Sequence, residues 1–309
     1  MSQNNYHTPA LYTETITGLV VNPSGVYADV TMGGAGHTRG ILGLLSDEGR
    51  LFGFDQDEAA LCNAPQDSRF TMVHSNFCHL KNFLRYYGVT QVDGVVADLG
   101  LSFRHVDDES RGFSFRFDAP LDMRMSRGRK LTAAGILAEY TPEQISNLFT
   151  IYGEIPRHTS KRIASEIERA RKVRPIEMTG EFLELLKPFI DPRKERKMLA
   201  QIFQSLRIET NQEMQVLRQL LTQALQVLKP GGRLVIISYH SLEDRLVKNF
   251  LKTGNFEGEV QKDFFGRNLS PFKLITNKPI VPSDEEIERN PRSRSAKLRI
   301  AEKIWPLNL

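Results

Sequence analysis

Apolar positions along the first hundred residues fall into short runs rich in β-branched and aromatic side chains, and each run ends in turn-forming residues. The runs cover residues 26–31, 50–55, 70–75 and 92–99, and a similar run follows at 233–239. Near-continuous apolar runs of this length are typical of strands that are buried on both faces of a parallel sheet. The pattern therefore predicts five such strands.

Segments of helical composition separate the first four predicted strands. They lie at residues 38–45, 58–63 and 80–88. Strands that alternate with helices are typical of a doubly wound sheet with helices on both faces. The first part of the chain therefore predicts an α/β nucleotide-binding fold.

A different pattern begins after Gly100. Residues 103–129 are rich in Arg, Asp and Gly and have no clear period, whereas residues 132–228 are almost wholly helical in propensity. Amphipathic runs at 157–173 and 208–228 each indicate a helix. Within the helical region, Thr141 and Gln144 match a capping box.

The strand pattern resumes after a tight turn at residues 229–232, and further apolar runs at 272–281 and 296–304 are expected to complete the sheet. The simplest arrangement is a mostly helical domain inserted after the fourth strand. We therefore predict a discontinuous core and one insertion, with the core at residues 1–105 and 200–309 and the insertion at residues 106–199.

Composition adds limits to this picture. The chain has 309 residues, of which 40% are hydrophobic and 25% charged, and its two cysteines, Cys62 and Cys78, belong to no metal-binding motif. These values exclude a disulfide-stapled secreted module and a collagen-like repeat, and no structural zinc is expected. The net charge of +4 permits an anionic partner but does not indicate nucleic acid by itself.

The N-terminal segment lacks the basic and apolar regions of a secretory signal, and no run of about 18 apolar residues is present. We therefore expect a cytoplasmic protein without a membrane span.

A glycine-rich segment at residues 29–38 (DVTMGGAGHT) follows the first predicted strand. Glycines at Gly33, Gly34 and Gly36 let the backbone pass close to a bound nucleotide, and Asp55 follows about 20 residues later, where a carboxylate can bind ribose hydroxyls. The spacing differs from G-x-G-x-x-G, so an S-adenosylmethionine loop is favoured over a dinucleotide loop. A nicotinamide oxidoreductase, or a turn without a ligand, remains an alternative.

Two further side chains are expected at the ligand-binding edge of the sheet. Asp98 ends the fourth predicted strand and His240 follows the fifth, and ligands of open α/β sheets bind beyond these strand ends. Asp98 can instead be a helix cap or turn residue, and His240 can be a structural histidine. We predict that Ser241 caps the next helix and that Asp244 completes its capping box.

Ordered sequence blocks extend along the whole chain: residues 7–9 (HTP), 29–38 (DVTMGGAGHT), 111–115 (RGFSF), 120–125 (PLDMRM), 152–154 (YGE), 203–208 (FQSLRI) with Asn211 and Glu213, 230–245 (PGGRLVIISYHSLEDR) and 290–299 (NPRSRSAKLR). Together they resemble the RsmH/MraW family of bacterial small-subunit (16S) ribosomal RNA cytosine-N4 methyltransferases.

The resemblance implies a class I S-adenosylmethionine-dependent methyltransferase (Rossmann-like) fold with an inserted, mostly helical substrate-recognition domain. It implies methyl transfer to the N4 amine of a cytidine in the decoding centre (P site) of 16S ribosomal RNA, on the assembled small subunit. Neither a monomer nor a homodimer is favoured. The resemblance also implies which residues contact the cofactor. At the matching positions this chain has Gly33, Gly34, Ala35, Gly36, His37, Asp55, Phe77, Asp98 and His105.

The chain departs from the family pattern at two of these positions. Residues 103–105 read Phe-Arg-His where the family usually has Ser-Pro-Gln, and an imidazole at His105 offers other hydrogen bonds than a Gln amide. Ala35 replaces a usual glycine, which fits if its backbone φ is negative.

The implied chemistry assigns roles to three residues. The N4 amine of cytosine is a poor nucleophile, because its lone pair is delocalised into the ring, so an acceptor for its N–H groups is needed. We predict that Asp98 positions the cofactor or the amine, and that His240 and Glu243 orient the base or receive its proton. No metal is expected.

Basic residues that neighbouring acids do not balance predict the RNA-binding surface. One cluster spans residues 157–174 and can equally be a solvated helix face; the other lies at 289–299. Phe113, Phe115 and Phe117 either line the entry to the pocket or form a strand on the core of the insertion. The predicted RNA contacts are Arg111, Arg124, Arg245, Arg292, Arg294 and Lys297.

A third functional class, after the methyltransferase and the nicotinamide oxidoreductase, is an RNA-binding assembly factor that has this fold but no catalytic activity.

Overall fold

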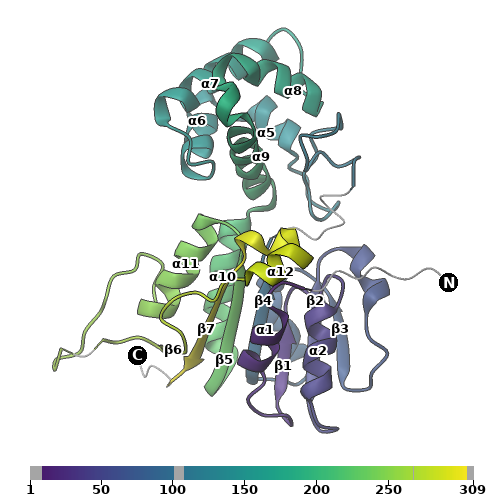
Figure 1. The fold of residues 1–309 in the computed structure, drawn as a ribbon, viewed down its shortest axis with the longest axis vertical. Coiled ribbons are helices and arrows are strands. Elements are labelled where there is room, and N and C mark those ends of the chain that lie inside the picture. Colours follow the sequence, from purple (N-terminus) through teal and green to yellow (C-terminus); the bar gives the residue numbers. More distant parts are fainter. Residues whose placement is uncertain (1–8, 101–107, 267, 305–309) are drawn as a thin grey trace. The chain divides into compact units, whose positions relative to one another are not determined.

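The computed structural model describes residues 9–100, 108–266 and 268–304. The chain forms two compact units (Figure 1). The first comprises Met1–Gly100 and Met214–Leu309, and the second is Leu101–Glu213. Both units are described separately below.

The first unit is built on a seven-stranded sheet with the order β3-β2-β1-β4-β5-β7-β6. Strands β1 to β5 pair in parallel, and β7 is antiparallel to both of its neighbours. This order, with one reversed strand, is that of the class I methyltransferase fold and confirms the expected fold class. The strands are β1 (Val26–Asp29), β2 (Arg50–Asp55), β3 (Phe70–His74), β4 (Val92–Asp98), β5 (Leu228–Ser238), β6 (Phe272–Leu274) and β7 (Lys297–Lys303).

Helices cover both faces of this sheet, because successive residues of each strand point to opposite faces. Val95 and Ala97 pack with α3, α10 and α11, whereas Val96 packs with α1 and α2. The helical segments of this unit are α1 (Tyr12–Leu19), α2 (Gly36–Leu44), η1 (Glu58–Asn63), η2 (Phe77–His79), α3 (Leu80–Tyr86), α10 (Glu213–Val227), α11 (Ser241–Thr253), α12 (Asp284–Arg289) and η5 (Pro291–Ser295).

The predicted strands are confirmed, with shifts at their ends. The turn at residues 229–232 is a bulge inside β5: the register passes from Val92 opposite Leu228 to Gly94 opposite Arg233. The run at 272–281 is a strand only over Phe272–Leu274, with one isolated bridge from Ile280. The segment Glu58–Asn63 is a 3-10 helix.

The second unit is helical and has a core of its own around buried Phe149, Ile163 and Phe182. The predicted capping box of Thr141 and Gln144 is confirmed at the start of α6. The predicted end of the insertion at residue 199 falls inside α9. The helical segments are α5 (Ala133–Glu139), α6 (Pro142–Ile151), α7 (Arg157–Arg171), α8 (Thr179–Leu186), η3 (Lys187–Phe189), η4 (Pro192–Lys194) and α9 (Glu195–Asn211).

Two predictions for the region between the strands are wrong. The run at 208–228 is not one helix, because Gln212 adopts a left-handed conformation with φ 51° and separates α9 from α10. Phe113, Phe115 and Phe117 form no strand. Phe113 and Phe115 nevertheless pack on the core of the second unit, while Phe117 is exposed.

No helix within the described parts of the chain combines the length and apolarity that a membrane crossing needs.

Candidate functional site

Three neighbouring parallel strands each end in an aspartate. Asp29 ends β1, Asp55 ends β2 and Asp98 ends β4, and the sheet order places β1 between the other two. The carboxyl ends of parallel strands lie at the same edge of a sheet. The sheet therefore concentrates three acidic groups where a ligand of this fold binds.

Asp29 connects β1 to the helix that follows it. Its carboxylate is buried and accepts hydrogen bonds from the Thr38 hydroxyl (2.6 Å) and from the Thr31 N–H (3.2 Å). Burial raises the pKa of Asp29, and the bond from Thr38 opposes this shift. The group thus holds the first turn of α2 against the end of β1.

The glycine-rich loop reverses the chain between β1 and α2. Gly33 and Ala35 have positive φ values of 49° and 60°, and Ala35 is fully buried. The expected negative φ at Ala35 is therefore wrong: its N–H donates to the carbonyl of Met32 (2.7 Å) in a turn that leads directly into α2. A side chain at Gly36 would lie 2.7 Å from Pro9, so that position requires glycine.

Asp55 links the end of β2 to the glycine-rich loop. One carboxylate oxygen accepts the Gly33 N–H and the other accepts the Asp57 N–H, both at 2.8 Å. Burial raises the pKa of Asp55, and these two backbone bonds oppose the rise. Each oxygen retains a second lone pair, so Asp55 can still accept bonds from ribose hydroxyls.

Asp98 lies at the centre of a small polar network. Its carboxylate accepts the Tyr239 hydroxyl at 2.8 Å, and the other oxygen is 3.7 Å from Nδ1 of His37. Burial raises the pKa of Asp98 to about 6; His37 and Tyr239 oppose the rise, and the charges of Asp29 and Glu243 add to it. Around neutral pH the carboxylate is therefore a basic acceptor.

Tyr239 is a site residue that the sequence analysis missed. It is the last residue before His240, and burial together with the charge of Asp98 raises its pKa, so its hydroxyl remains protonated and donates. Its ring also lies 3.1 Å from where a side chain at Gly100 would begin. The sequence feature that could have identified Tyr239 is its position directly after the fifth predicted strand, at the ligand-binding edge of the sheet.

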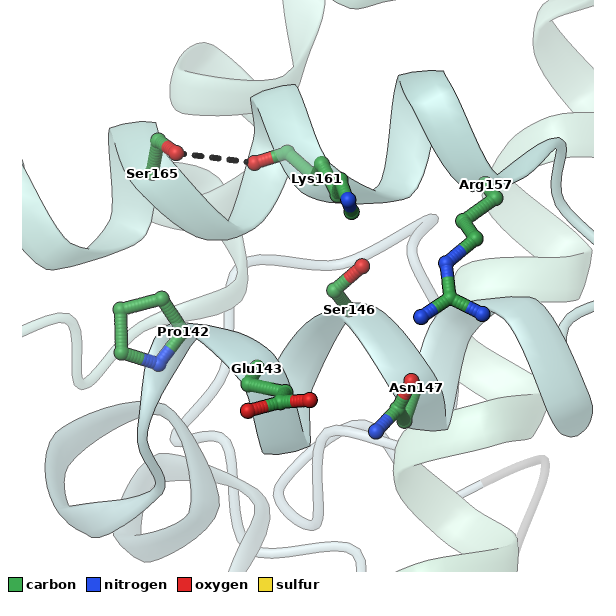
Figure 2. Close-up of a pocket in the computed structure, with 7 residues that line it drawn as sticks. All are labelled: Pro142, Glu143, Ser146, Asn147, Arg157, Lys161 and Ser165. Carbon is green, nitrogen blue, oxygen red and sulfur yellow. Dashed lines mark hydrogen bonds between the residues drawn. The ribbon is translucent and has the colours of Figure 1, made fainter.

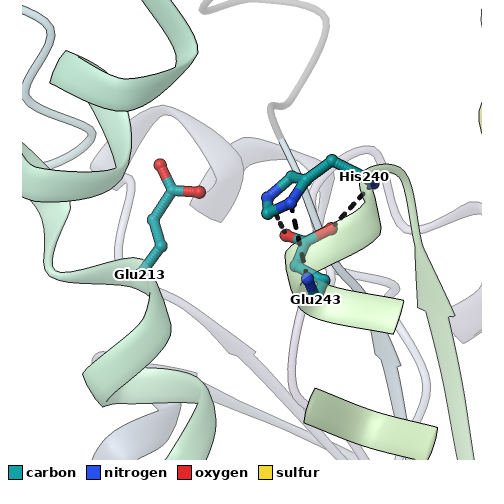
Figure 3. A group of neighbouring side chains, drawn as sticks. All are labelled: Glu213, His240 and Glu243. Carbon is teal, nitrogen blue, oxygen red and sulfur yellow. Dashed lines mark hydrogen bonds and ion pairs between the residues drawn. The ribbon is translucent and has the colours of Figure 1, made fainter. Parts of the chain in front are cut away.

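The start of α11 is capped by His240, so the predicted cap at Ser241 is wrong. Oε2 of Glu243 accepts the backbone N–H groups of Tyr239 (3.0 Å) and His240 (3.4 Å). The His240 ring lies over this carboxylate, with Nε2 at 3.2 Å from Oε1 (Figure 3). Asp244 bonds to Arg299 on β7 instead of closing a capping box.

The other residues predicted to bind the cofactor differ in their burial and contacts. His37 is buried, and Nε2 of its ring lies 3.1 Å from the Ala10 carbonyl. Phe77 begins η2 shortly after β3 and is half-buried. Gly34 is exposed beside the loop turn. His105 lies outside the described residues.

Two of the predicted RNA contacts, Arg111 and Arg124, have hydrogen-bond partners within the protein. The Arg111 guanidinium donates to the carbonyls of Arg124 and Met125 and lies over the Phe113 ring at 5.5 Å. Arg124 pairs with Asp122 at 2.7 Å and also donates to nearby carbonyls. Both guanidinium groups therefore stabilise the loop before α5.

The other predicted contacts lie in the sheet unit. Arg245, Arg292 and Arg294 are exposed on α11 and η5. Lys297 lies 3.6 Å from Asp244, which also binds Arg299.

Acids pair with the later part of the basic run at residues 157–174, although they do not equal it in number. Glu166 pairs with Arg169, Glu168 with Arg171 and Lys172, and Glu181 with Arg174.

A model of the MraW methylase family matches residues 4–304. The chain belongs to this family. Proteins named "Ribosomal RNA small subunit methyltransferase H" are similar over nearly the full length: that of Parabacteroides distasonis is 58% identical over 300 residues, covering 97% of this chain and 98% of the relative. The protein of Flavobacterium johnsoniae is 52% identical over 299 residues, with the same two coverages.

Family membership makes the chain an S-adenosylmethionine-dependent methyltransferase, and the acidic edge of the sheet fits this cofactor. S-adenosylmethionine carries a sulfonium and an ammonium cation and no phosphate. Burial raises the pKa values of Asp29, Asp55 and Asp98, and the charge of Asp29 adds to the rise at the other two, so a cation is attracted there and a pyrophosphate repelled. Membership of the methylase family excludes the nicotinamide oxidoreductase alternative.

Proposed function

We propose that this methyltransferase methylates the exocyclic N4 amine of a cytidine in the decoding centre (P site) of 16S ribosomal RNA, on the assembled small subunit. The substrate class is supported by relatives that are named for small-subunit ribosomal RNA and are up to 58% identical to this chain. The base and atom are supported by the family resemblance of the sequence blocks. This substrate places the enzyme in the cytoplasm.

The observation that carries the proposal is the environment of Asp98. Its carboxylate is held by the Tyr239 hydroxyl at 2.8 Å, and burial raises its pKa to about 6. An acceptor of this kind can take a hydrogen bond from the N4 amine as the lone pair leaves conjugation with the ring. The same carboxylate can then receive the proton that the methylated nitrogen must lose.

The loop and strand ends would hold the cofactor, which supplies an electrophilic methyl group when bound. The loop from Gly33 to His37, with positive φ values at Gly33 and Ala35, would line the cofactor site. Asp55 would accept hydrogen bonds from the ribose hydroxyls, and Phe77 would contribute from its position after β3. We also propose cofactor contacts at Gly34, Gly36 and His105, because the family resemblance assigns cofactor contacts to these positions.

His240 and Glu243 act as positioning residues in this proposal. The Glu243 carboxylate already accepts two backbone N–H groups after the end of β5, which fixes the position of Tyr239. Nε2 of His240 is buried and lies 3.2 Å from Oε1 of Glu243, so the two side chains hold each other in place beside Tyr239. Arg245, Arg292 and Arg294 supply exposed cations for RNA phosphates.

The direct experiment supplies labelled S-adenosylmethionine and small subunits from a strain that lacks the modification, followed by nucleoside analysis. N4-methylcytidine at the P site supports the proposal. Another methylated nucleoside contradicts the assigned atom, and naked 16S ribosomal RNA in a parallel reaction tests the requirement for an assembled subunit. Cofactor binding without any product would instead favour an assembly factor.

Variants of one strand test the role of Asp98. We expect Asp98→Ala to lower kcat by about a thousandfold or more, because it removes an acceptor used in the transition state. Asp93→Asn is the matched control: Asp93 lies near the other end of β4 and pairs with Lys229 at 2.7 Å. Near-normal turnover of the Asp98 variant would contradict the role.

A further inference from the structure

A cavity of about 310 Å³ lies within the helical unit, between α6 and α7. Glu143, Ser146 and Asn147 line it from α6, and Arg157, Lys161 and Ser165 line it from α7 (Figure 2). Pro142 completes the lining, and the other six side chains are all polar, two of them cations. The cavity involves neither the strand ends nor the glycine-rich loop.

The two cations of the cavity differ from Arg169 and Arg171 of the same helix. Arg157 and Lys161 are exposed, and among the described residues neither has an ion pair, whereas Arg169 and Arg171 each pair with a glutamate. Arg157 is also the first residue of α7, whose first turn contains no acid. A cation at this end of a helix is opposed by the helix dipole, so an anion would stabilise the local arrangement.

Ser146 gives an independent indication of a ligand. Only 5% of its surface is exposed, and its hydroxyl has no hydrogen bond to any residue in the described parts of the chain. In Figure 2 this hydroxyl points into the space below Lys161. The hydroxyl opens onto the cavity and has no partner among the described residues, so it can donate to an acceptor oxygen bound there.

Glu143 does not neutralise the cavity. It lies in the first turn of α6, where an acid is favourable to the helix dipole. No ion pair joins it to Arg157 or Lys161 among the residues that the structure describes. The lining therefore has a surplus of positive charge and of hydrogen-bond donors, which matches an anion with several acceptor oxygens.

We propose that this cavity binds a phosphodiester group of the substrate RNA. Arg157 and Lys161 neutralise the phosphate, and the Ser146 hydroxyl and Asn147 amide donate hydrogen bonds to its oxygens. The choice of RNA over other phosphate-bearing ligands rests on the proposed function. A contact of this kind fixes the position of the strand and reads no sequence.

The test compares two charge-matched double variants, Arg157→Ala/Lys161→Ala and Arg193→Ala/Lys194→Ala. Arg193 and Lys194 are exposed in η4 and do not line the cavity. We measure binding of a labelled single-stranded RNA containing the target sequence at several salt concentrations, and KM and kcat with small subunits. The cavity variant should bind about tenfold more weakly, with a salt slope lowered by about 1–2 and an unchanged kcat.

Ser146→Ala provides a second measurement that a structural role would not reproduce. Loss of the hydroxyl should weaken RNA binding about threefold while leaving thermal stability equal or higher, because the hydroxyl has no partner in the free protein. Lower stability with unchanged RNA binding would contradict the proposal.

The outcomes separate this inference from the proposed function. If the wild-type protein methylates RNA and the cavity variant binds and reacts like the η4 variant, the cavity proposal is wrong. If the wild type forms no methylated cytidine but only the cavity variant loses RNA binding, the site is supported and the proposed reaction is wrong.

Discussion

At the residue scale, the dominant feature is a set of one buried and two half-buried carboxylates at one edge of the sheet. Asp29, Asp55 and Asp98 are each partly compensated by hydrogen bonds, yet burial raises all three pKa values. Such groups store electrostatic free energy in the protein without its ligand. A cationic cofactor would release part of that energy on binding.

The raised pKa of Asp98 predicts a pH-dependent effect of Asp98→Asn on stability. The native state binds the Asp98 proton more tightly than the unfolded state, so the wild type loses stability as pH rises from about 4 to about 6. Removing the charge should therefore raise the free energy of unfolding by about 1–2 kcal/mol at neutral pH and by almost nothing near pH 4, since the side chain is partly exposed. Urea unfolding at both pH values measures this.

Asp93→Asn serves as the control of opposite sign. Burial would raise the pKa of Asp93, but Lys229 and the Val26 N–H hold it below its usual range. This variant should lose stability at neutral pH and lose less in acid. A gain for Asp98→Asn that is equal at both pH values would contradict the assigned cause.

The positive φ of Ala35 predicts the effect of two substitutions there. Ala35→Gly relieves left-handed strain but loses a buried methyl group and gains unfolded-state entropy, so we expect a change within about 0.5 kcal/mol. Ala35→Val should lose about 2 kcal/mol or more, because a β-branched residue is strongly disfavoured at this φ. Chemical denaturation measures both, and a tolerated valine would contradict the strain.

At the element scale, boundaries are set by single residues whose backbone leaves the regular conformation. His240 follows β5 and is the N-cap of α11, where Glu243 accepts its N–H. Gln212 ends α9 with a φ of 51°, and α10 begins at the next residue. The amphipathic pattern continues across Gln212, so periodicity alone does not locate this break.

Gln212→Gly is expected to stabilise the protein by about 0.5–1 kcal/mol, because glycine adopts the left-handed conformation without a Cβ penalty. The same substitution at Gln219, an exposed position inside α10, should instead cost about 1 kcal/mol. Urea denaturation of both variants tests the break, since equal losses would indicate a continuous helix.

At the scale of the whole molecule, one chain builds two units with separate cores. The sheet unit is assembled from both ends of the chain, and β7 inserts between β5 and β6. The helical unit has a core of its own around Phe149 and Phe182. Residues that pack within one core are not found in the other, which predicts that the two units unfold separately.

Two core substitutions test separate unfolding. Phe149→Ala in the helical unit should lower the Tm of one calorimetric transition, and Phe52→Ala in the sheet unit should lower the Tm of the other, each by removing about 3–5 kcal/mol. S-adenosylhomocysteine should raise only the transition sensitive to Phe52→Ala. A single transition that shifts in both variants would contradict this independence.

Local chemistry explains why some features were predicted correctly. Strands β1, β2 and β4 are visible because most of their residues are buried on both faces and therefore read as nearly continuous apolar runs. The capping box at Thr141 depends only on residues within one turn. Asp98 was placed at the ligand-binding edge because its position at a strand end follows from the chain order.

Features that depend on distant partners were not predictable in this way. Tyr239 becomes a site residue only because its hydroxyl reaches Asp98, and the hydrogen bonds from the Arg111 guanidinium to carbonyls across a loop are likewise invisible in the sequence pattern. The sign of φ at Ala35 depends on the turn that closes onto Met32.

The sequence by itself determined the family, the doubly wound sheet and the acidic residues at the strand ends, because these depend on short-range pattern and order along the chain. Only the tertiary structure decided which of those acids are buried together, which basic residues are paired and which hydroxyl, at Ser146, has no partner among the described residues. Burial and pairing are set by groups that are far apart in sequence, and they determine the charge and the reactivity of each side chain.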